Sequence, residues 1–152
     1  YHYFQGREAI LVALVEEGYR RLEEALAQAR SANEGAAPDV ITRAAGCAYL
    51  TCALANPGVF RIMFRSDMYD SDAHPQVRTA SLAARAQLRS LASLAYGTDD
   101  PRAELTLWAY VHGLATLALD GPPALGVGEQ VRRCALEAID APYFVDGLRG
   151  VR

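Results

Sequence analysis

Apolar side chains recur every three or four residues from Arg7 to about Ala32. The recurring positions are Leu11, Leu14 and Val15, Gly18 and Tyr19, Leu22, Ala25 and Leu26, and Ala29. This spacing predicts one long amphipathic helix. Two charge pairs, Glu16 with Arg20 and Glu17 with Arg21, stand four residues apart on its polar face, where ion pairs are expected. Such a helix must bury its apolar stripe against other helices, which favours an all-α fold.

The same helical periodicity continues through the rest of the chain, and no strand pattern or internal repeat interrupts it. Five further helices are predicted, over Asp39 to about Ala55, Gly58–Phe64, Pro75–Tyr96, Pro101 to about Leu119, and Gly128–Ile139. Asp39 is expected to be the N-cap of the second helix, and Asn56 that of the third. Gly97 is expected to end the fourth helix in a left-handed conformation.

Length and charge narrow the classes of function. The 152 residues suffice for one domain with a substantial core. A net charge of −3 gives no positive field over the whole surface, so any contact with DNA must be local. The three cysteines have no zinc-ligand spacing and indicate reduced thiols, which favours the cytoplasm. No apolar run is long enough for a membrane span, and no signal-peptide pattern is present.

One polar loop combines several acidic residues with a histidine. Asp67, Asp70, Asp72 and His74 lie within eight residues and could hold a divalent metal. The spacing matches no calcium loop, since the central glycine and the distal glutamate are missing. A solvated loop is the favoured interpretation, and neither a metal nor a cofactor is expected.

The last two predicted helices are apolar on more than one side. The Pro101–Leu119 helix carries two stripes, and the last helix carries a smooth stripe of small residues. A short chain has few ways to cover both helices fully, which favours a symmetric homodimer formed through a four-helix bundle. The alternative is that both helices are central in a monomer. The expected dimer contacts are Leu107, Val111, Leu114, Ala118, Val131, Cys134, Ala135 and Ala138.

Three segments resemble one family. Residues 1–11 (YHYFQGREAIL) are similar to the junction between the recognition helix and the fourth helix of TetR-family transcriptional repressors. Residues 55–64 (ANPGVFRIMF) are similar to a run common in the effector domains of that family. Residues 108–113 (WAYVHG) resemble the signature of its WHG subgroup of C-terminal domains. The resemblance implies a TetR-like helical C-terminal domain.

The resemblance also implies a division of the chain and a set of DNA contacts. Residues 1–6 would be the C-terminal end of a helix-turn-helix domain, and residues 7–152 the effector-binding and dimerisation domain. Tyr1, His2, Tyr3 and Arg7 would contact DNA phosphates. An arginine in the first turn of a helix, beside free backbone N–H groups, is also a physically reasonable anion site. Packing of Tyr3 and Phe4 against the first helix is the alternative.

An effector would bind between the helices of the C-terminal domain. The candidate pocket residues are Tyr49, Cys52, Phe60, Met63, Phe64, Leu88, Trp108 and His112. Aromatic residues and Met at helical spacing are more often ordinary core, so that alternative stays open for each of them. Trp108 and His112 lie one turn apart and could orient an effector, but a structural role for the pair is favoured.

Together these features predict a ligand-responsive transcriptional regulator. The resemblance implies a repressor, because most members of the family repress transcription. A mostly apolar effector would shift a dimer between arrangements that bind operator DNA and arrangements that do not. The long first helix would transmit the change, and Gly18 is the position at which this helix is expected to bend most easily. The chain lacks G-x-S-x-G, P-loop and H-E-x-x-H patterns, so no enzyme is expected. The alternative function is a dimeric helical module that binds a ligand or a partner protein without binding DNA.

Overall fold

The computed structural model describes residues 2–65, 67–126 and 128–141, with side chains from residue 6 onward. This part of the chain is helical throughout, apart from its turns and loops. The elements are α1 (His2–Ala32), α2 (Pro38–Ala55), α3 (Pro57–Met63), α4 (Pro75–Tyr96), α5 (Pro101–Asp120), the short 3-10 turn η1 (Pro123–Leu125) and α6 (Glu129–Asp140). The all-α prediction is therefore confirmed.

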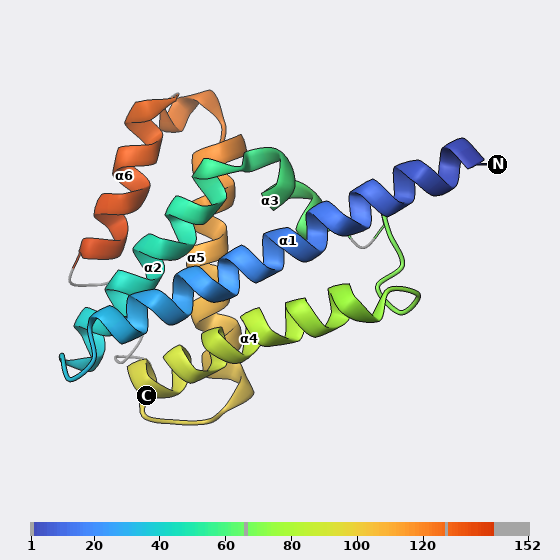
Figure 1. Ribbon diagram of the computed structural model, residues 1–152. Coiled ribbons are helices and arrows are strands. Elements are labelled where there is room, and N and C mark those ends of the chain that lie inside the picture. The colour runs from blue at the N-terminus through green and yellow to red at the C-terminus, as the bar shows by residue number, and fades with distance from the viewer. Residues whose placement is uncertain (1, 66, 127, 142–152) are drawn as a thin grey trace.

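The helices surround one core, with α1 lying across α2 and α4 (Figure 1). α5 packs against α2 and α4, and α6 packs against α2 and α5. The largest fully buried side chains are Val15, Leu26, Thr42, Tyr49, Leu50, Val77, Leu91 and Ile139. They come from the apolar stripes of α1, α2, α4 and α6, so burial of those stripes is what holds the helices together.

The first helix is longer than its sequence pattern predicts. α1 begins at His2 rather than at Arg7, and it passes through Gly6 at an ordinary negative φ. A single glycine costs a helix only about 1 kcal/mol, so Gln5 and Gly6 do not end it. The predicted start of this helix at Arg7 is therefore wrong. Arg7 lies in the second turn, where its backbone N–H joins the helical ladder and is not free to bind an anion.

The helix termini follow the sequence signals in part. Gly97 ends α4 at a φ of 67°, as predicted, because glycine adopts the left-handed conformation without a steric penalty. α2 begins at Pro38, so Asp39 lies in its first turn and is not the N-cap. Asn56 does occupy the N-cap of α3, but its side chain makes no capping hydrogen bond.

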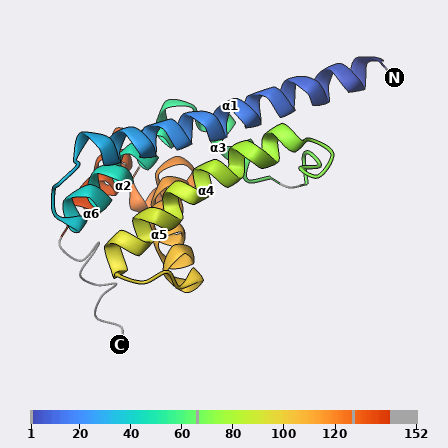
Figure 2. The same cartoon turned by 60° about the horizontal axis from the view of Figure 1, so that its bottom comes forward.

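The N-terminal end of α1 extends beyond the other helices, and both views agree on this (Figure 2). Ile10 is 64% exposed there, and Leu14, one turn further on, is 43% exposed. Among the described residues, no helix combines the length and the apolar character that crossing a membrane requires.

Candidate functional site

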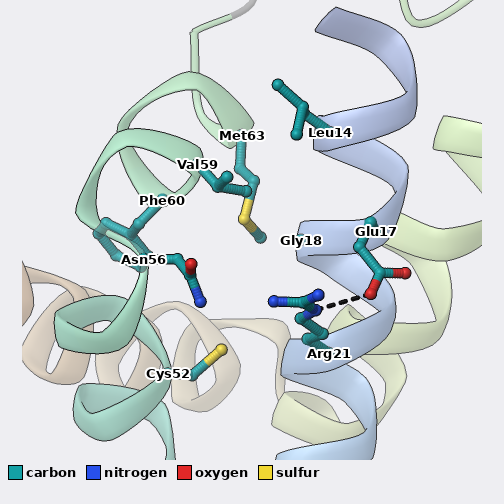
Figure 3. Close-up of a pocket in the computed structure, with 9 residues that line it drawn as sticks. All are labelled: Leu14, Glu17, Gly18, Arg21, Cys52, Asn56, Val59, Phe60 and Met63. Atoms are coloured by element: carbon teal, nitrogen blue, oxygen red, sulfur yellow. Dashed lines mark hydrogen bonds and ion pairs between the residues drawn. The ribbon is translucent and has the colours of Figure 1, made fainter. Parts of the chain in front are cut away.

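A cavity of about 220 Å³ lies between α1, the end of α2 and α3 (Figure 3). It is lined by Leu14, Glu17, Gly18, Arg21, Cys52, Asn56, Val59, Phe60 and Met63. Leu14, Gly18 and Arg21 stand on one face of α1 because they are spaced by four and three residues. The opposite wall comes from successive turns of α3. The walls are apolar, and the polar side chains gather at one end (Figure 3).

Gly18 allows α3 to approach α1 closely. A Cβ atom built at this position would lie 2.5 Å from Met63 Sδ and 2.7 Å from Val59 Cγ1. Both distances are shorter than the contacts that Cβ atoms make with neighbouring atoms in proteins. The missing side chain thus leaves room for Met63 and Val59 against the helix backbone, and it keeps the cavity open beside them.

Two tyrosines hold the C-terminal end of α3 in place. The Tyr19 hydroxyl donates a hydrogen bond to the Met63 carbonyl oxygen at 2.7 Å, and the Tyr69 hydroxyl donates to the same oxygen at 2.6 Å. Carbonyls in the last turn of a helix lack partners within the helix, so these bonds satisfy an otherwise open acceptor. Burial raises the pKa of both tyrosines, which keeps both hydroxyls protonated as donors.

The polar end of the cavity is built around Glu17. Its Oε1 accepts hydrogen bonds from Arg21 Nε at 2.6 Å and from Arg20 Nη2 at 2.8 Å, and its Oε2 accepts one from Arg20 Nε at 2.8 Å. These bonds, with that from Arg21 the largest cause, lower the pKa of Glu17. The predicted Glu17–Arg21 pair is confirmed. The predicted Glu16–Arg20 pair is wrong, because Arg20 bonds Glu17 and Glu24 instead.

The thiol of Cys52 lies at the same end, on α2. Burial raises its pKa, and the nearby charge of Arg21 opposes that effect in part. The net direction is upward, so Cys52 contributes a neutral, weakly polar surface to the cavity. Asn56 stands at the corner between α2 and α3, and its side-chain amide points towards the Arg21 guanidinium across the cavity (Figure 3).

An aromatic cluster lies behind the cavity wall. The Phe60 ring centroid is 5.1 Å from that of Phe64, and the Phe64 centroid is 4.5 Å from that of His112 and 6.2 Å from that of Trp108. His112 Nδ1 is 2.9 Å from the Tyr49 hydroxyl oxygen. Burial lowers the pKa of His112, so the ring is neutral at neutral pH and Nδ1 shares a hydrogen bond with the Tyr49 hydroxyl.

The eight predicted pocket residues fall into three groups. Cys52, Phe60 and Met63 line the cavity. Phe64, Trp108 and His112 belong to the aromatic cluster behind it. Tyr49 and Leu88 lie in the packed core, where the void they line measures only about 10 Å³. The first group is therefore the one that a bound molecule could touch without displacing core side chains.

Trp108 is the cluster member with an unused polar atom. Its Nε1 is buried and makes no hydrogen bond within the described part of the chain. Burial raises the pKa of Tyr49, and the neighbouring Trp108 indole opposes that rise.

Six lining residues were not predicted from the sequence: Leu14, Glu17, Gly18, Arg21, Asn56 and Val59. One local signal does point to them. Gly18 interrupts the apolar stripe of a long helix, with Leu14 one turn before it and Arg21 one turn after it. A glycine in the middle of a helical stripe indicates a close approach by another element, but the sequence does not identify α3 as that element.

The residues predicted at the dimer interface differ in their exposure. Leu107, Val111, Ala118 and Ala135 are buried in the core of the domain. Leu114, Val131 and Ala138 are half-buried, and Cys134 is exposed. The outer face of α5 instead presents Leu105 and Leu117, which are 63% and 45% exposed.

The residues predicted to contact DNA lie at the start of α1. Tyr1 is outside the described residues, and the side chains of His2 and Tyr3 are outside the described part as well. Arg7 is exposed on the projecting end of α1.

The acidic loop before α4 is organised by ion pairs. Asp67 accepts two hydrogen bonds from Arg65, which lower its pKa to about 2, and Asp72 lies 3.6 Å from Arg78. His74 Nε2 is 3.1 Å from Glu8 Oε1 on α1. Within residues 2–65, 67–126 and 128–141, no three His, Cys, Asp or Glu side chains are grouped as metal ligands.

The comparisons with known proteins agree with this architecture. Residues 42–141 match the family described as the tetracyclin repressor-like, C-terminal domain. The chain belongs to this family. A solved structure titled "Structure of a protein with unknown function from Rhodococcus sp. RHA1" is 30% identical, with a TM-score of 0.75. The similarity covers 94% of this TetR-like chain and 73% of the other. No curated protein matches the chain.

Proposed function

We propose that this TetR-like domain is the sensing and dimerising part of a ligand-responsive transcriptional regulator, and that ligand binding releases DNA. The observation that carries the proposal is the cavity between α1 and α3. One wall of the cavity is α1, and Arg7 lies on the same helix about two turns before Leu14. A molecule in the cavity therefore acts directly on the element that leads to the N-terminus.

The proposed mechanism uses the close contact at Gly18. A ligand that separates Val59 and Met63 from α1 would change how α3 seats against the helix. α3 is also tied to α5 by the two-pronged pair of Arg61 with Asp120, at 2.7 Å for the shortest contact. A change in the position of α3 would pass to α1, because the two helices are in close contact at Gly18. Tyr1, His2, Tyr3 and Arg7 would contact DNA phosphates at the far end.

A homodimer is the second part of the proposal. Leu105, Ala109, Gly113 and Leu117 follow one another at four-residue spacing on α5 and face outward. A Cβ built at Gly113 would meet no atom of the subunit within 4 Å. Val131, Cys134 and Ala138 of α6 add small side chains with exposed or partly exposed surface. An exposed apolar stripe on two adjacent helices is typical of a four-helix dimer interface.

Sedimentation of the purified chain tests the dimer. The wild type should sediment as a dimer, and Gly113→Arg should produce a monomer because a charged side chain would be forced into the interface. Ala86→Arg, on the exposed face of α4, is the matched control and should remain dimeric. A monomeric wild type would contradict this part of the proposal.

The regulatory function needs a test with DNA. The protein expressed from its complete reading frame would be mixed with sheared genomic DNA of the source organism, and the retained fragments would be sequenced. A shared palindromic sequence among them, released by a small-molecule extract of the same cells, is the expected result. If no sequence is enriched, the alternative function is favoured, a dimeric helical module that binds a ligand or partner without DNA.

Two further properties follow from the same proposal. Regulators that bind chromosomal DNA act in the cytoplasm of bacteria, so we expect the protein there. We also expect it to act by binding rather than by catalysis.

A further inference from the structure

The size of the cavity limits what it can bind. Its volume of about 220 Å³ exceeds the roughly 150 Å³ of an engineered protein cavity that binds benzene. It is smaller than the range of about 300–1,000 Å³ that is common for drug-sized ligands. A ligand of one ring, or of equivalent aliphatic size, with a short substituent therefore fits without displacing the walls.

The apolar walls of the cavity determine where the apolar part of such a ligand would lie. Leu14, Val59, Phe60 and Met63 present methyl groups, an aromatic ring and a thioether. None of these four side chains has a strong hydrogen-bond donor or acceptor. The apolar part of the ligand is expected here, where its transfer from water is favourable.

The polar end supplies N–H donors that have no partner among the described residues. Both oxygens of Glu17 already accept hydrogen bonds from Arg20 or Arg21. Arg21 uses only Nε for Glu17, and its two terminal NH₂ groups have no hydrogen-bond partner among the described residues. The Asn56 amide across the cavity is also without a partner there, and the two groups face each other (Figure 3).

We propose that the cavity binds a compact monocarboxylate, with its apolar body between α1 and α3 and its carboxylate between Arg21 and Asn56. This inference rests on the proposed function and names the chemical class of the effector. A carboxylate is planar and has two oxygens, which match the donor pair of a guanidinium. A neutral amide of the same shape lacks the charge and presents only one acceptor oxygen.

Glu17 is the internal competitor for Arg21. A bound carboxylate and the Glu17 carboxylate are like charges that share one guanidinium. Removing the charge of Glu17 therefore strengthens the binding of an anion, while Arg20 still pairs with Glu24. A purely structural role for the Glu17–Arg21 pair predicts no such gain, so the Glu17→Gln variant separates the two roles.

Phenylacetate and phenylacetamide are suitable probes because they share one ring and differ in charge. Binding at about pH 7.5 would be followed by calorimetry and by the fluorescence of Trp108, the only tryptophan. The indole contacts Phe64, which contacts the cavity residue Phe60. Phenylacetate is expected to bind about tenfold more tightly than phenylacetamide, as a charge-assisted contact at a partly exposed site allows.

Three variants locate the effect. Arg21→Gln should remove the preference for phenylacetate, and Glu17→Gln should increase it severalfold. Val59→Phe should abolish binding of both probes by filling the cavity. Arg89→Gln changes the charge equally on the exposed face of α4, away from the cavity, and should behave like the wild type.

Other results would contradict either the carboxylate inference or the cavity as the effector site. Equal or tighter binding of phenylacetamide, or a preference that survives Arg21→Gln, would overturn the carboxylate inference. If Val59→Phe still abolishes probe binding in that case, the cavity remains a ligand site and the proposed function stands. If neither probe binds and the Val59→Phe protein still releases DNA in the cell extract, the cavity is not the effector site.

Discussion

The two sides of the helical core differ in how completely their side chains fill the space. Between α2, α4 and α5, large residues such as Tyr49 and Leu91 leave a void of about 10 Å³. Between α1 and α3, a glycine faces Met63, and a cavity of about 220 Å³ remains beside them. The packed side supplies stability, whereas the open side gains space for a ligand by giving up side-chain volume.

The packed side should be the more sensitive to truncation. Leu91 is 1% exposed, and Leu91→Ala should lower the free energy of unfolding by about 3 kcal/mol, because it removes buried methyl groups and leaves a cavity. Leu14→Ala at the cavity edge, where the side chain is 43% exposed, should cost less than about 1 kcal/mol. Urea denaturation measures both. Equal losses would contradict the comparison.

The open side should resist added volume at one position. Gly6→Ala and Gly18→Ala both replace a glycine within α1, which by itself favours the helix by about 1 kcal/mol. Gly6 has open space around it, so the substitution should stabilise the protein. At Gly18 the new Cβ would collide with Met63 and Val59, so a net loss of about 1 kcal/mol is expected. A gain at both positions would show that α3 can move away freely.

The attachment of α3 can be tested through the Met63 carbonyl. Tyr19→Phe or Tyr69→Phe alone should cost about 0.5–1 kcal/mol, because the other hydroxyl still satisfies the oxygen. The double variant should lose more than the sum, since the carbonyl then has no donor. A double-mutant cycle in urea measures this coupling. Tyr96→Phe is the control, because its buried hydroxyl has no hydrogen-bond partner in the described part of the chain.

The smallest expected effect is the pH dependence contributed by His112. Burial lowers its pKa in the folded protein, so the unfolded chain binds the proton more readily as the pH falls below about 6.5. The folded state therefore loses stability in that range. His112→Gln removes this contribution, so its stability should fall less than that of the wild type between about pH 7 and pH 5. Parallel urea curves at both pH values check the sign.

Much of the fold could be predicted from local patterns. The spacing of Leu22 and Leu26, and the glycine at position 97, identified helices and a helix end that the structure confirms. α1 begins before the predicted Arg7, because the single glycine at position 6 does not end a helix.

The candidate site was predictable only in part. Phe60 and Met63 were predicted because they are large apolar residues on a short helix next to a loop, and binding residues are often found at such places. Arg21 was interpreted as a solvated charge, and nothing in the sequence placed it opposite Asn56. Tyr49 was selected because it is aromatic, but it lies in the packed core.

The sequence by itself determined the helices, because periodicity, caps and glycines act over neighbouring residues along one chain segment. Only the tertiary structure decided which face of α1 would meet α3 and how much space would remain between them. That space depends on the distance between backbones far apart in sequence, and on whether the side chains at the crossing fill it. At Gly18 and Met63 they do not, and the cavity lies there.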